Sequence, residues 1–488
     1  MRQCIALLVL VATNLVAGCA QFSPDGGMDE VASGVARDAG PDAGRSVVKI
    51  ASAEQAQRAK EQVAALLAGP LSAEQAVQVA LLNNRELQAA YNDLGISEAD
   101  YVQASLPPNP GVSFMGVSGT GVANMEVRLI EDILSLFTLP RRTAIAAEHF
   151  AHARHQAIST TLRLAVDTRR THVRAVAAQQ QVVFLDQARA TVDQAVRLNA
   201  QLGEAGGGDQ LDQAELAAFY AELSAKVGQA RLAACRERER LIRLMGLWGS
   251  DAGFVLPTEL PALPGEPETL ATVEIEAVNR RVDLIMGRHD ITALAKSLSL
   301  TQATRYVSML QLAGIFNNES ANPLTNSNTA INRGGAAIDL RLPIFDTGEA
   351  RERKARESYM AALNRLAARA VNARSEARIA YETYRGTYDI AKFYRDRVLP
   401  LRGVVSREIA LRYSQGTLAD ERLRVDLFKY LIDARARITA DAAAIDARRD
   451  FLIGAVDLQA ALTIGANGSG AAEGSSAPAA IGPPSGME

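Results

Sequence analysis

The sequence predicts a mainly α-helical protein with a small β part, built from two copies of the same plan. Hydrophobic residues make up 48% of the 488 residues and aromatic residues only 5%, a mixture typical of long helices packed through small side chains. Each half of the chain contains, in order, a short helix, a β-hairpin, a long helix, a glycine turn and another long helix. In the β segments, apolar and charged residues alternate.

Composition and motifs also exclude several classes of function. The 52 basic and 55 acidic side chains give a formal net charge of −3, which is not the basic footprint that nucleic-acid binding requires. The sequence lacks the GxSxG, HExxH and GxxxxGK[ST] patterns of common catalytic sites. We therefore expect that the protein is not an enzyme, and that it has no catalytic residues and no cofactor apart from a covalent lipid.

The lipid is expected at the N-terminus. Residues 1–18 contain an apolar stretch that is too short to span a bilayer and is typical of a secretory signal. The segment Leu15-Val16-Ala17-Gly18-Cys19 resembles a bacterial lipobox, which implies cleavage before Cys19 and acylation of its thiol, palmitate included. The alternative is an ordinary cleaved signal followed by a chance cysteine. Because no other stretch is apolar enough for a transmembrane helix, any further spanning structure would have to be β.

The domain boundaries follow from composition and from the repeat. Residues 19–70 are expected to form a lipidated tether and a short helix, 251–270 a Pro-rich linker, and 463–488 a disordered tail. The first repeat covers 71–250, with a short helix, a hairpin at 106–132 and long helices at 140–202 and 210–247. The second repeat covers 271–462, with a short helix, a hairpin at 304–345 and long helices at 347–415 and 418–460.

The strands are predicted from their alternation. Met125, Val127 and Leu129 alternate with Glu126 and Arg128, so one face of the strand is apolar and the other is charged. The expected strands are 111–118 and 123–130 in the first hairpin, and 305–316 and 335–344 in the second. Four strands cannot close on themselves, and open edges cannot lie in lipid. The strands are therefore expected to be pooled from several chains, and three chains would give twelve transmembrane strands.

The long helices are predicted to pair as antiparallel coiled coils. Apolar residues recur at 3–4 spacing from Leu363 to Leu401, a period that specifies left-handed supercoiling. At 1.5 Å per residue, each longest helix would extend about 100 Å. Pro400 is expected to kink the second of them.

In this order of elements the chain resembles the TolC-like family of outer-membrane efflux channels, in its lipoprotein branch. The resemblance covers about residues 71–460. It rests on the duplicated plan and on four segments: Leu71–Leu87 with its counterpart Asn279–Leu284, Leu342-Pro343-Ile344-Phe345-Asp346-Thr347-Gly348, Val398-Leu399-Pro400, and Tyr413-Ser414-Gln415-Gly416. It implies a homotrimer with a twelve-stranded barrel and an α-helical tunnel.

The resemblance also implies a function and a location. The chain is expected to be the outer-membrane channel of a tripartite efflux system, a passive conduit for small molecules or metal ions. Its expected partners are a periplasmic adaptor (membrane fusion) protein and an inner-membrane pump, and it would be lipid-anchored in the outer membrane of a Gram-negative bacterium. Two alternatives stay open: the conduit of a type I protein secretion system, and a non-spanning periplasmic coiled-coil scaffold lipoprotein.

By the same resemblance, the periplasmic turns carry the gate and contact the adaptor. The gate candidates are Asp212, Tyr413, Asp420 and Glu421, and the candidate adaptor contacts are Gly206, Gly207, Gly416 and Thr417. The chain departs from the family pattern at Leu418, where some members carry a gate arginine, and at Arg422 and Val425, where some carry an acidic ring. Alternatively, these are ordinary solvated residues at helix ends.

A histidine run and a cysteine are further candidates. His149, His152 and His155 recur every three residues, so two of them could share a metal ion on one helix face. A solvated helix face is favoured instead, because soft Met or Cys ligands are missing nearby, and we expect no metal site. Cys235 is expected to serve packing rather than chemistry.

Overall fold

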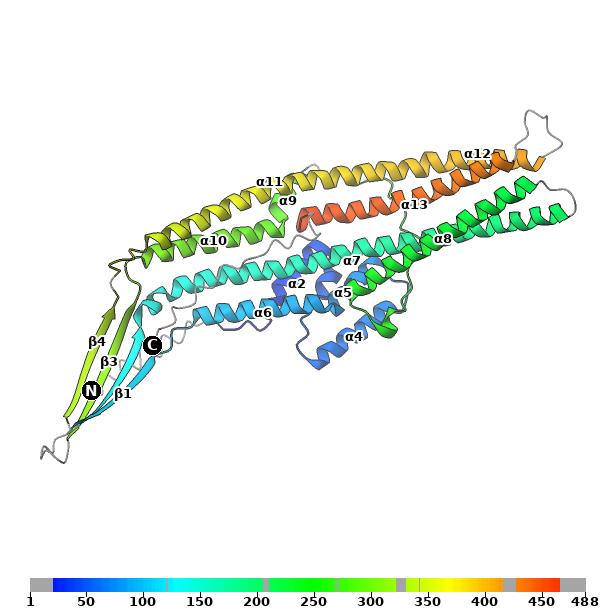
Figure 1. The fold of residues 1–488 in the computed structure, drawn as a ribbon. Coiled ribbons are helices and arrows are strands. Elements are labelled where there is room, and N and C mark those ends of the chain that lie inside the picture. The colour runs from blue at the N-terminus through cyan, green and yellow to red at the C-terminus, as the bar shows by residue number, and fades with distance from the viewer. Residues whose placement is uncertain are drawn as a thin grey trace.

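The computed structural model describes residues 21–119, 122–204, 210–267, 269, 272–321, 331–341, 343–415 and 427–465. The protein is elongated, with its strands gathered at one end and paired helical tips at the other (Figure 1). Shorter helices surround the middle of the long ones. None of the helices in this part of the chain is both long and apolar enough to cross a membrane.

Both repeats contain the same succession of elements. The first comprises α5 (Ala73–Asn83), α6 (Arg85–Ser105), β1 (Gly111–Gly119), β2 (Val122–Asp132), α7 (Ile133–Glu204) and α8 (Gln210–Met245). The second comprises α9 (Val273–Arg280), α10 (Val282–Ala303), β3 (Leu310–Ala321), β4 (Ile331–Leu340), α11 (Glu349–Phe393), the π-helix η3 (Tyr394–Val398), α12 (Leu399–Gln415) and α13 (Leu427–Thr463). A 3₁₀ turn, η2 (Gly249–Ala252), follows α8.

Side-chain caps fix where the helices of the first repeat begin. The Ser72 hydroxyl accepts from the Gln75 backbone N–H, and the Gln75 side chain accepts from the Ser72 N–H, which forms a capping box at α5. Asn84 caps α6 by accepting from the Leu87 N–H at 3.0 Å. At the end of β2, Asp132 accepts from the Ser135 N–H at 3.0 Å. α7 therefore starts at Ile133, earlier than the predicted residue 140.

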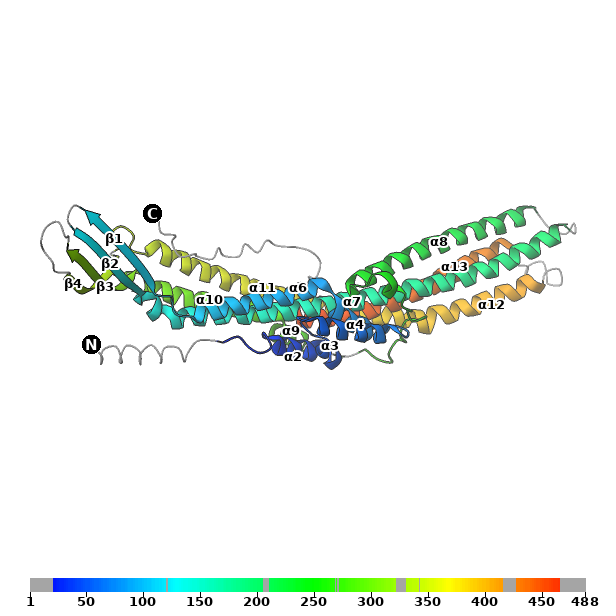
Figure 2. The same cartoon turned by 90° about the horizontal axis from the view of Figure 1, so that it is seen from below.

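Shorter helices pack along the length of the long ones. α6 and α8 pack along successive stretches of α7, while α10 and α13 do the same along α11 and α12 (Figures 1 and 2). α10 and α13 also contact α7, so the two repeats are joined along their length. The core between α11 and its neighbours in the second repeat is rich in alanine, including Ala373, Ala377 and Ala380, and small side chains let helix axes approach closely.

The predicted kink at Pro400 is a π-helical turn rather than a break. Proline lacks the N–H that would bond the Asp396 carbonyl. One residue earlier, the Leu399 N–H bonds the Tyr394 carbonyl, five residues back. This wider turn accommodates Pro400, which cannot make the usual helical hydrogen bond. π-bulges inside α-helices commonly occur at such irregularities.

The strands form one antiparallel sheet in the order β1-β2-β3-β4. Phe114 pairs with Val127, which pairs with Phe316 on the next strand, so the three share a face. β1 and β4 are the two edges of this sheet within the part of the chain that the structure describes.

The second hairpin differs from the prediction at both strands. β3 begins at Leu310 rather than at residue 305, because the Arg305 N–H still bonds the Gln302 carbonyl at the end of α10. The Arg305 guanidinium pairs with Glu352 at 2.9 Å. β4 is 331–340 rather than 335–344, and Pro343, which has no N–H to give to a ladder, lies beyond its end.

The predicted N-terminal tether is wrong for the residues that the structure describes from Gln21 onward. They form α2 (Met28–Ala39), α3 (Pro41–Arg45) and α4 (Ala53–Leu67). Val31 and Val35 of α2 are completely buried in a core cluster that contains residues of both repeats. Gly34 allows the close approach, because a Cβ there would lie 2.7 Å from the Ile158 side chain.

We call residues 23–39 the N-terminal strap, since polar contacts fasten them to four helices. The Ser23 N–H donates to Glu98 of α6 at 2.7 Å. Arg169 of α7 donates to the Ala39 carbonyl at 3.0 Å, and Asp38 pairs with Arg280 of α9 at 2.8 Å. Gln459 of α13 donates to the Asp38 carbonyl. The C-terminal end is also ordered further than predicted, because Thr463 and Ile464 are buried.

Candidate functional site

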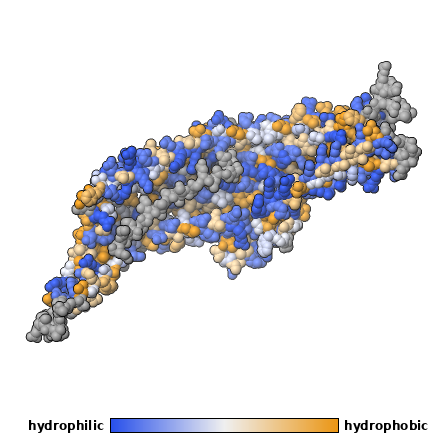
Figure 3. All heavy atoms as spheres, viewed as in Figure 1, coloured by the Kyte–Doolittle hydropathy of each residue, from blue (hydrophilic) through white to orange (hydrophobic). Residues whose placement is uncertain are grey.

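One face of the sheet is apolar although it is open to solvent. Phe114 and Ile338 are 69% and 71% exposed. The pairing register places them on one face with Val112, Met125, Val127, Leu129, Leu312 and Phe316. We call this the apolar face, and apolar residues are visible at this end of the molecule in Figure 3. A patch of this kind on a monomer marks a surface that binds another molecule or lipid.

The opposite face of the same sheet carries the charges. Glu126 and Arg128 of β2 form an ion pair, and Glu319 of β3 pairs with Arg333 of β4 at 3.2 Å. Asp339 lies on this face as well, because its strand partner Gln311 does. The alternation predicted from the sequence therefore separates most of the large apolar side chains from the ion pairs, while Glu131 lies on the apolar face and Met115 and Ile315 lie on the charged one.

At the other end of the molecule, the structure places two predicted gate residues near each other. Tyr413 of α12 stacks on Tyr430 of α13, with ring centroids 5.1 Å apart. Partial burial raises the pKa of Tyr413, and the charge of Asp212 raises it further. Asp212 lies in the first turn of α8, and the two helical hairpins meet in a cluster that includes Leu216 of α8 and Leu427 of α13. The sequence did not indicate Tyr430, since its partner follows from the antiparallel pairing of α12 and α13.

The remaining site residues predicted for lipidation, the gate and the adaptor contact lie outside the described residues. They are the lipidation candidate Cys19, the gate candidates Asp420 and Glu421, and the turn residues Gly206, Gly207, Gly416 and Thr417.

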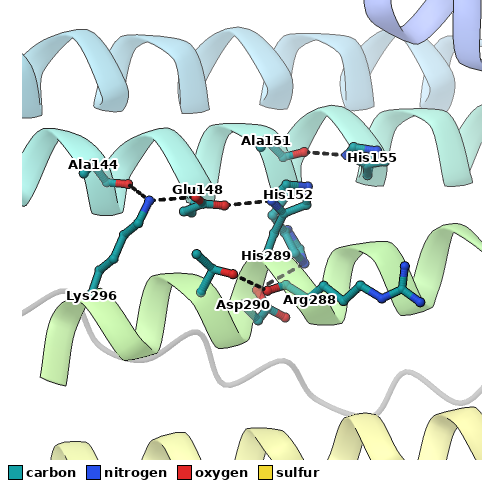
Figure 4. Close-up of polar contacts among 10 residues, drawn as sticks. Ala144, Glu148, Ala151, His152, His155, Arg288, His289, Asp290 and Lys296 are labelled. Carbon is teal, nitrogen blue, oxygen red and sulfur yellow. Dashed lines mark hydrogen bonds and ion pairs between the residues drawn. The ribbon is translucent and has the colours of Figure 1, made fainter. Parts of the chain in front are cut away.

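The histidine run of α7 meets a fourth histidine on α10 (Figure 4). The ring of His155 lies 5.3 Å, centroid to centroid, from that of His289. His289 Nδ1 donates to Glu148 at 2.8 Å, and His152 faces Asp290 at 3.6 Å. We call this contact between α7 and α10 the histidine seam. Because α10 lies about 140 residues away in sequence, the HxxHxxH pattern alone could not reveal it.

Burial affects the protonation of two histidines of the histidine seam, His152 and His155. Burial lowers the pKa of His152, opposed by the Asp290 carboxylate. Burial also lowers the pKa of His155, although its ring N–H donates to the Ala151 carbonyl at 2.9 Å. Among the described residues, no three His, Cys, Asp or Glu side chains are arranged to hold a metal ion. Cys235, expected to serve packing rather than chemistry, is a free cysteine with an exposed side chain.

Comparisons with known proteins identify the fold. The sequence matches no protein-family model and no curated protein. A membrane protein from Pseudomonas aeruginosa has a similar structure, with a TM-score of 0.67 and 19% identity over 80% of this chain and 93% of its own. The CmeC outer membrane channel of Campylobacter jejuni gives 0.65 and 16%, over 81% and 87%.

A third structure, the open state of the MtrE outer membrane channel of Neisseria gonorrhoeae, gives a TM-score of 0.64 and 16% identity, over 80% of this chain and 89% of its own. At these identities the likeness establishes the fold. The chain has the fold of the TolC-like outer-membrane channels, as the sequence predicts.

Proposed function

We propose that this protein is the outer-membrane channel of a tripartite efflux system, a passive conduit from the periplasm to the exterior for small molecules or metal ions. The observation that carries the proposal is the sheet with one apolar and one charged face, joined to long helical hairpins in the fold of outer-membrane channels. An apolar outside and a polar inside is the pattern of strands that cross the outer membrane. A periplasmic scaffold would have no use for such a face.

The proposal requires several copies of the chain. In hydrocarbon, each unpaired backbone group at the edges of β1 and β4 would cost several kcal/mol. Pairing β4 of one copy with β1 of the next removes both edges. We propose a homotrimer with twelve strands, whose apolar faces contact lipid and whose charged faces, with Glu126 and Arg333, line the water-filled interior.

The helical tips are the proposed contact with the other two components. A conduit cannot supply energy, so an inner-membrane pump would do so, and a periplasmic adaptor would connect the two. Tyr413, Tyr430 and Asp212 lie at these tips and would hold the resting channel closed. A lipid on Cys19 would add an anchor beside the strands' own membrane contact.

Planar bilayers test this function directly. The purified protein should produce discrete conductance steps, because each inserted assembly adds one aqueous path. A matched variant with Phe114→Asp and Ile338→Asp should insert far less, since two charges on the apolar face oppose lipid contact. The control exchanges exposed residues on the helices, Phe393→Asp and Val371→Asp. If the wild-type protein gives no conductance, the scaffold alternative is the better account.

A further inference from the structure

The turn after α8 presents the chain's one tryptophan to solvent. Leu247 is buried, whereas its neighbour Trp248 is 84% exposed. Burying a side chain of this size stabilises a fold, a gain that this turn forgoes. Exposed tryptophan with a large apolar ring and a polar N–H is enriched where proteins bind other molecules.

The turn is built to hold that ring in place. Gly246 and Gly249 flank it with φ angles of +65° and +61°, which favour glycine. A Cβ on Gly246 would lie 2.9 Å from the Asn83 carbonyl oxygen. The Asn83 amide donates to the carbonyls of Met245 and Gly246 at 3.1 and 2.7 Å. The indole is therefore presented by a pre-organised turn, which lowers the entropic cost of binding.

Trp248 stands at the rim of a groove of about 560 Å³ between α4 and the junction of α5 with α6. α4 projects from the side of the bundle and contributes the small residues Ala53 and Ala56 to the wall (Figure 1). Two exposed cations, Lys60 and Arg85, line the groove from opposite sides. The groove thus combines one flat aromatic surface, small apolar walls and two positive charges, with the carboxylate of Asp251 also in its lining.

We propose that this groove binds an acidic glycan. A pyranose ring has one face of C–H groups that stacks on an indole, while its hydroxyl groups and acidic substituents point outward. Lys60 and Arg85 are placed to pair with carboxylates on such a chain, and charged hydrogen bonds of this kind are among the stronger ones.

A protein partner fits this groove less well. Helix docking requires a continuous apolar surface with anchors spaced along it. Here the wall of α4 is formed by alanines and polar side chains, and Trp248 supplies the large exposed apolar surface. One ring surrounded by charge matches a ligand whose rings are themselves apolar on one face and polar at the edge.

The choice of probe rests on the proposed function, which places the middle of the molecule in the periplasm, where peptidoglycan is the abundant acidic glycan. Trp248 is the one tryptophan of the chain, so its fluorescence reports this groove alone. Soluble peptidoglycan fragments should shift and saturate its emission, and the full-length protein should co-sediment with intact sacculi. Neutral N-acetylglucosamine hexamers should bind at least about tenfold more weakly, because they lack the carboxylates.

Variants separate the parts of the site. Trp248→Ala should abolish co-sedimentation, and Lys60→Gln with Arg85→Gln should weaken the emission response about tenfold. Phe393→Ala and Arg353→Gln, which alter an exposed aromatic ring and an exposed cation elsewhere, should change neither. Circular dichroism of each variant checks its fold. Bilayer conductance of Trp248→Ala should equal that of the wild type, so glycan binding and channel function fail separately.

The proposal is overturned by any of three results. The first is unchanged Trp248 emission at millimolar peptidoglycan fragments. The second is equal binding of neutral and acidic glycans, unaffected by Lys60→Gln and Arg85→Gln. The third is an emission shift that requires added protein, which would assign the groove to a protein partner.

Discussion

The rings of His155 and His289 face each other across the boundary between the two repeats, with centroids 5.3 Å apart. Several titratable and charged groups lie near them. α7 contributes Glu148, His149, His152 and Arg154, α10 contributes Asp290 and Lys296, α2 contributes Glu30, and Arg369 of α11 lies near the α10 residue Gly287. Two imidazolium ions at this separation would repel each other.

Stability should therefore fall in mildly acidic solution. Burial lowers the folded-state pKa values of His152 and His155, so the unfolded chain takes up protons first as the pH drops below about 6.5. The contribution of these two histidines to the free energy of unfolding is complete above that pH. It is lost as the pH falls toward their folded-state pKa values. Thermal unfolding measured from pH 7.5 to pH 5 should show a steep decline.

His152→Gln with His155→Gln should flatten that decline without abolishing it. His172 is also buried, its pKa is lowered as well, and its ring contacts the Leu71 carbonyl at 2.7 Å. The loss linked to Glu148 falls in a separate, more acidic window, since its pKa is lowered from that of an ordinary glutamate. An unchanged slope in the double variant would show that the histidine seam does not titrate with unfolding.

The N-terminal strap should contribute substantially to stability. Val31→Ala and Val35→Ala each remove buried methyl groups from a core shared by both repeats and should each lower the free energy of unfolding by about 1–3 kcal/mol. Denaturant unfolding measures this, with the exposed Val371→Ala as the matched control, expected within about 0.5 kcal/mol of wild type. If all three variants change the free energy of unfolding equally, the packing of the N-terminal strap does not contribute to stability.

At the tips, the Tyr413–Tyr430 stack should hold the channel closed. A stacked pair contributes about 1 kcal/mol, so Tyr413→Ala and Asp212→Ala should each raise the open probability about fivefold, and the double variant should raise it further. Tyr413→Phe keeps the ring and should change conductance much less. If Tyr413→Phe opens the channel as fully as the double variant, the hydroxyl rather than the stack is the contact that matters.

The anchor prediction concerns Cys19. With Cys19→Ala, labelled palmitate should no longer be incorporated, while trimers should still form, because the apolar face contacts lipid independently of the anchor. Palmitate labelling measures acylation, and gel migration measures trimer formation, in the wild type and in Cys19→Ala. Incorporation of equal label by both would place the acyl group elsewhere or refute the lipobox.

Local patterns predict the fold class because they coincide with local structure here. The alternation at Met125–Leu129 defines a face whatever the strand pairs with, and the glycine turns end helices in any context. The N-terminal strap is not evident from the sequence, because Met28, Val31 and Val35 lie in a segment rich in Gly, Asp and Ser. Their helical spacing forms a buried face only when α7 is present to pack against it.

The sites show the same division. HxxHxxH is visible in the sequence, but its partners His289 and Asp290 come from the other repeat. Trp248 is visible as the single tryptophan, yet its exposure depends on a turn held by Asn83, far away in the chain. Long-range pairings of this kind leave no periodic signal.

A disulfide between sheet edges would test whether the strands of several chains are pooled in one barrel. Within one chain, two strands separate β1 from β4, so their residues lie about 14 Å apart at the usual strand spacing, which is too far for a disulfide. Ser113→Cys on β1 combined with Ala337→Cys or Asp339→Cys on β4, all on the charged face, can therefore cross-link only between copies. With Cys235→Ser as background, oxidation in membranes should yield covalent dimers and trimers under denaturing electrophoresis. Monomer alone, at every pairing of positions along the two edges, would contradict a channel built from pooled strands.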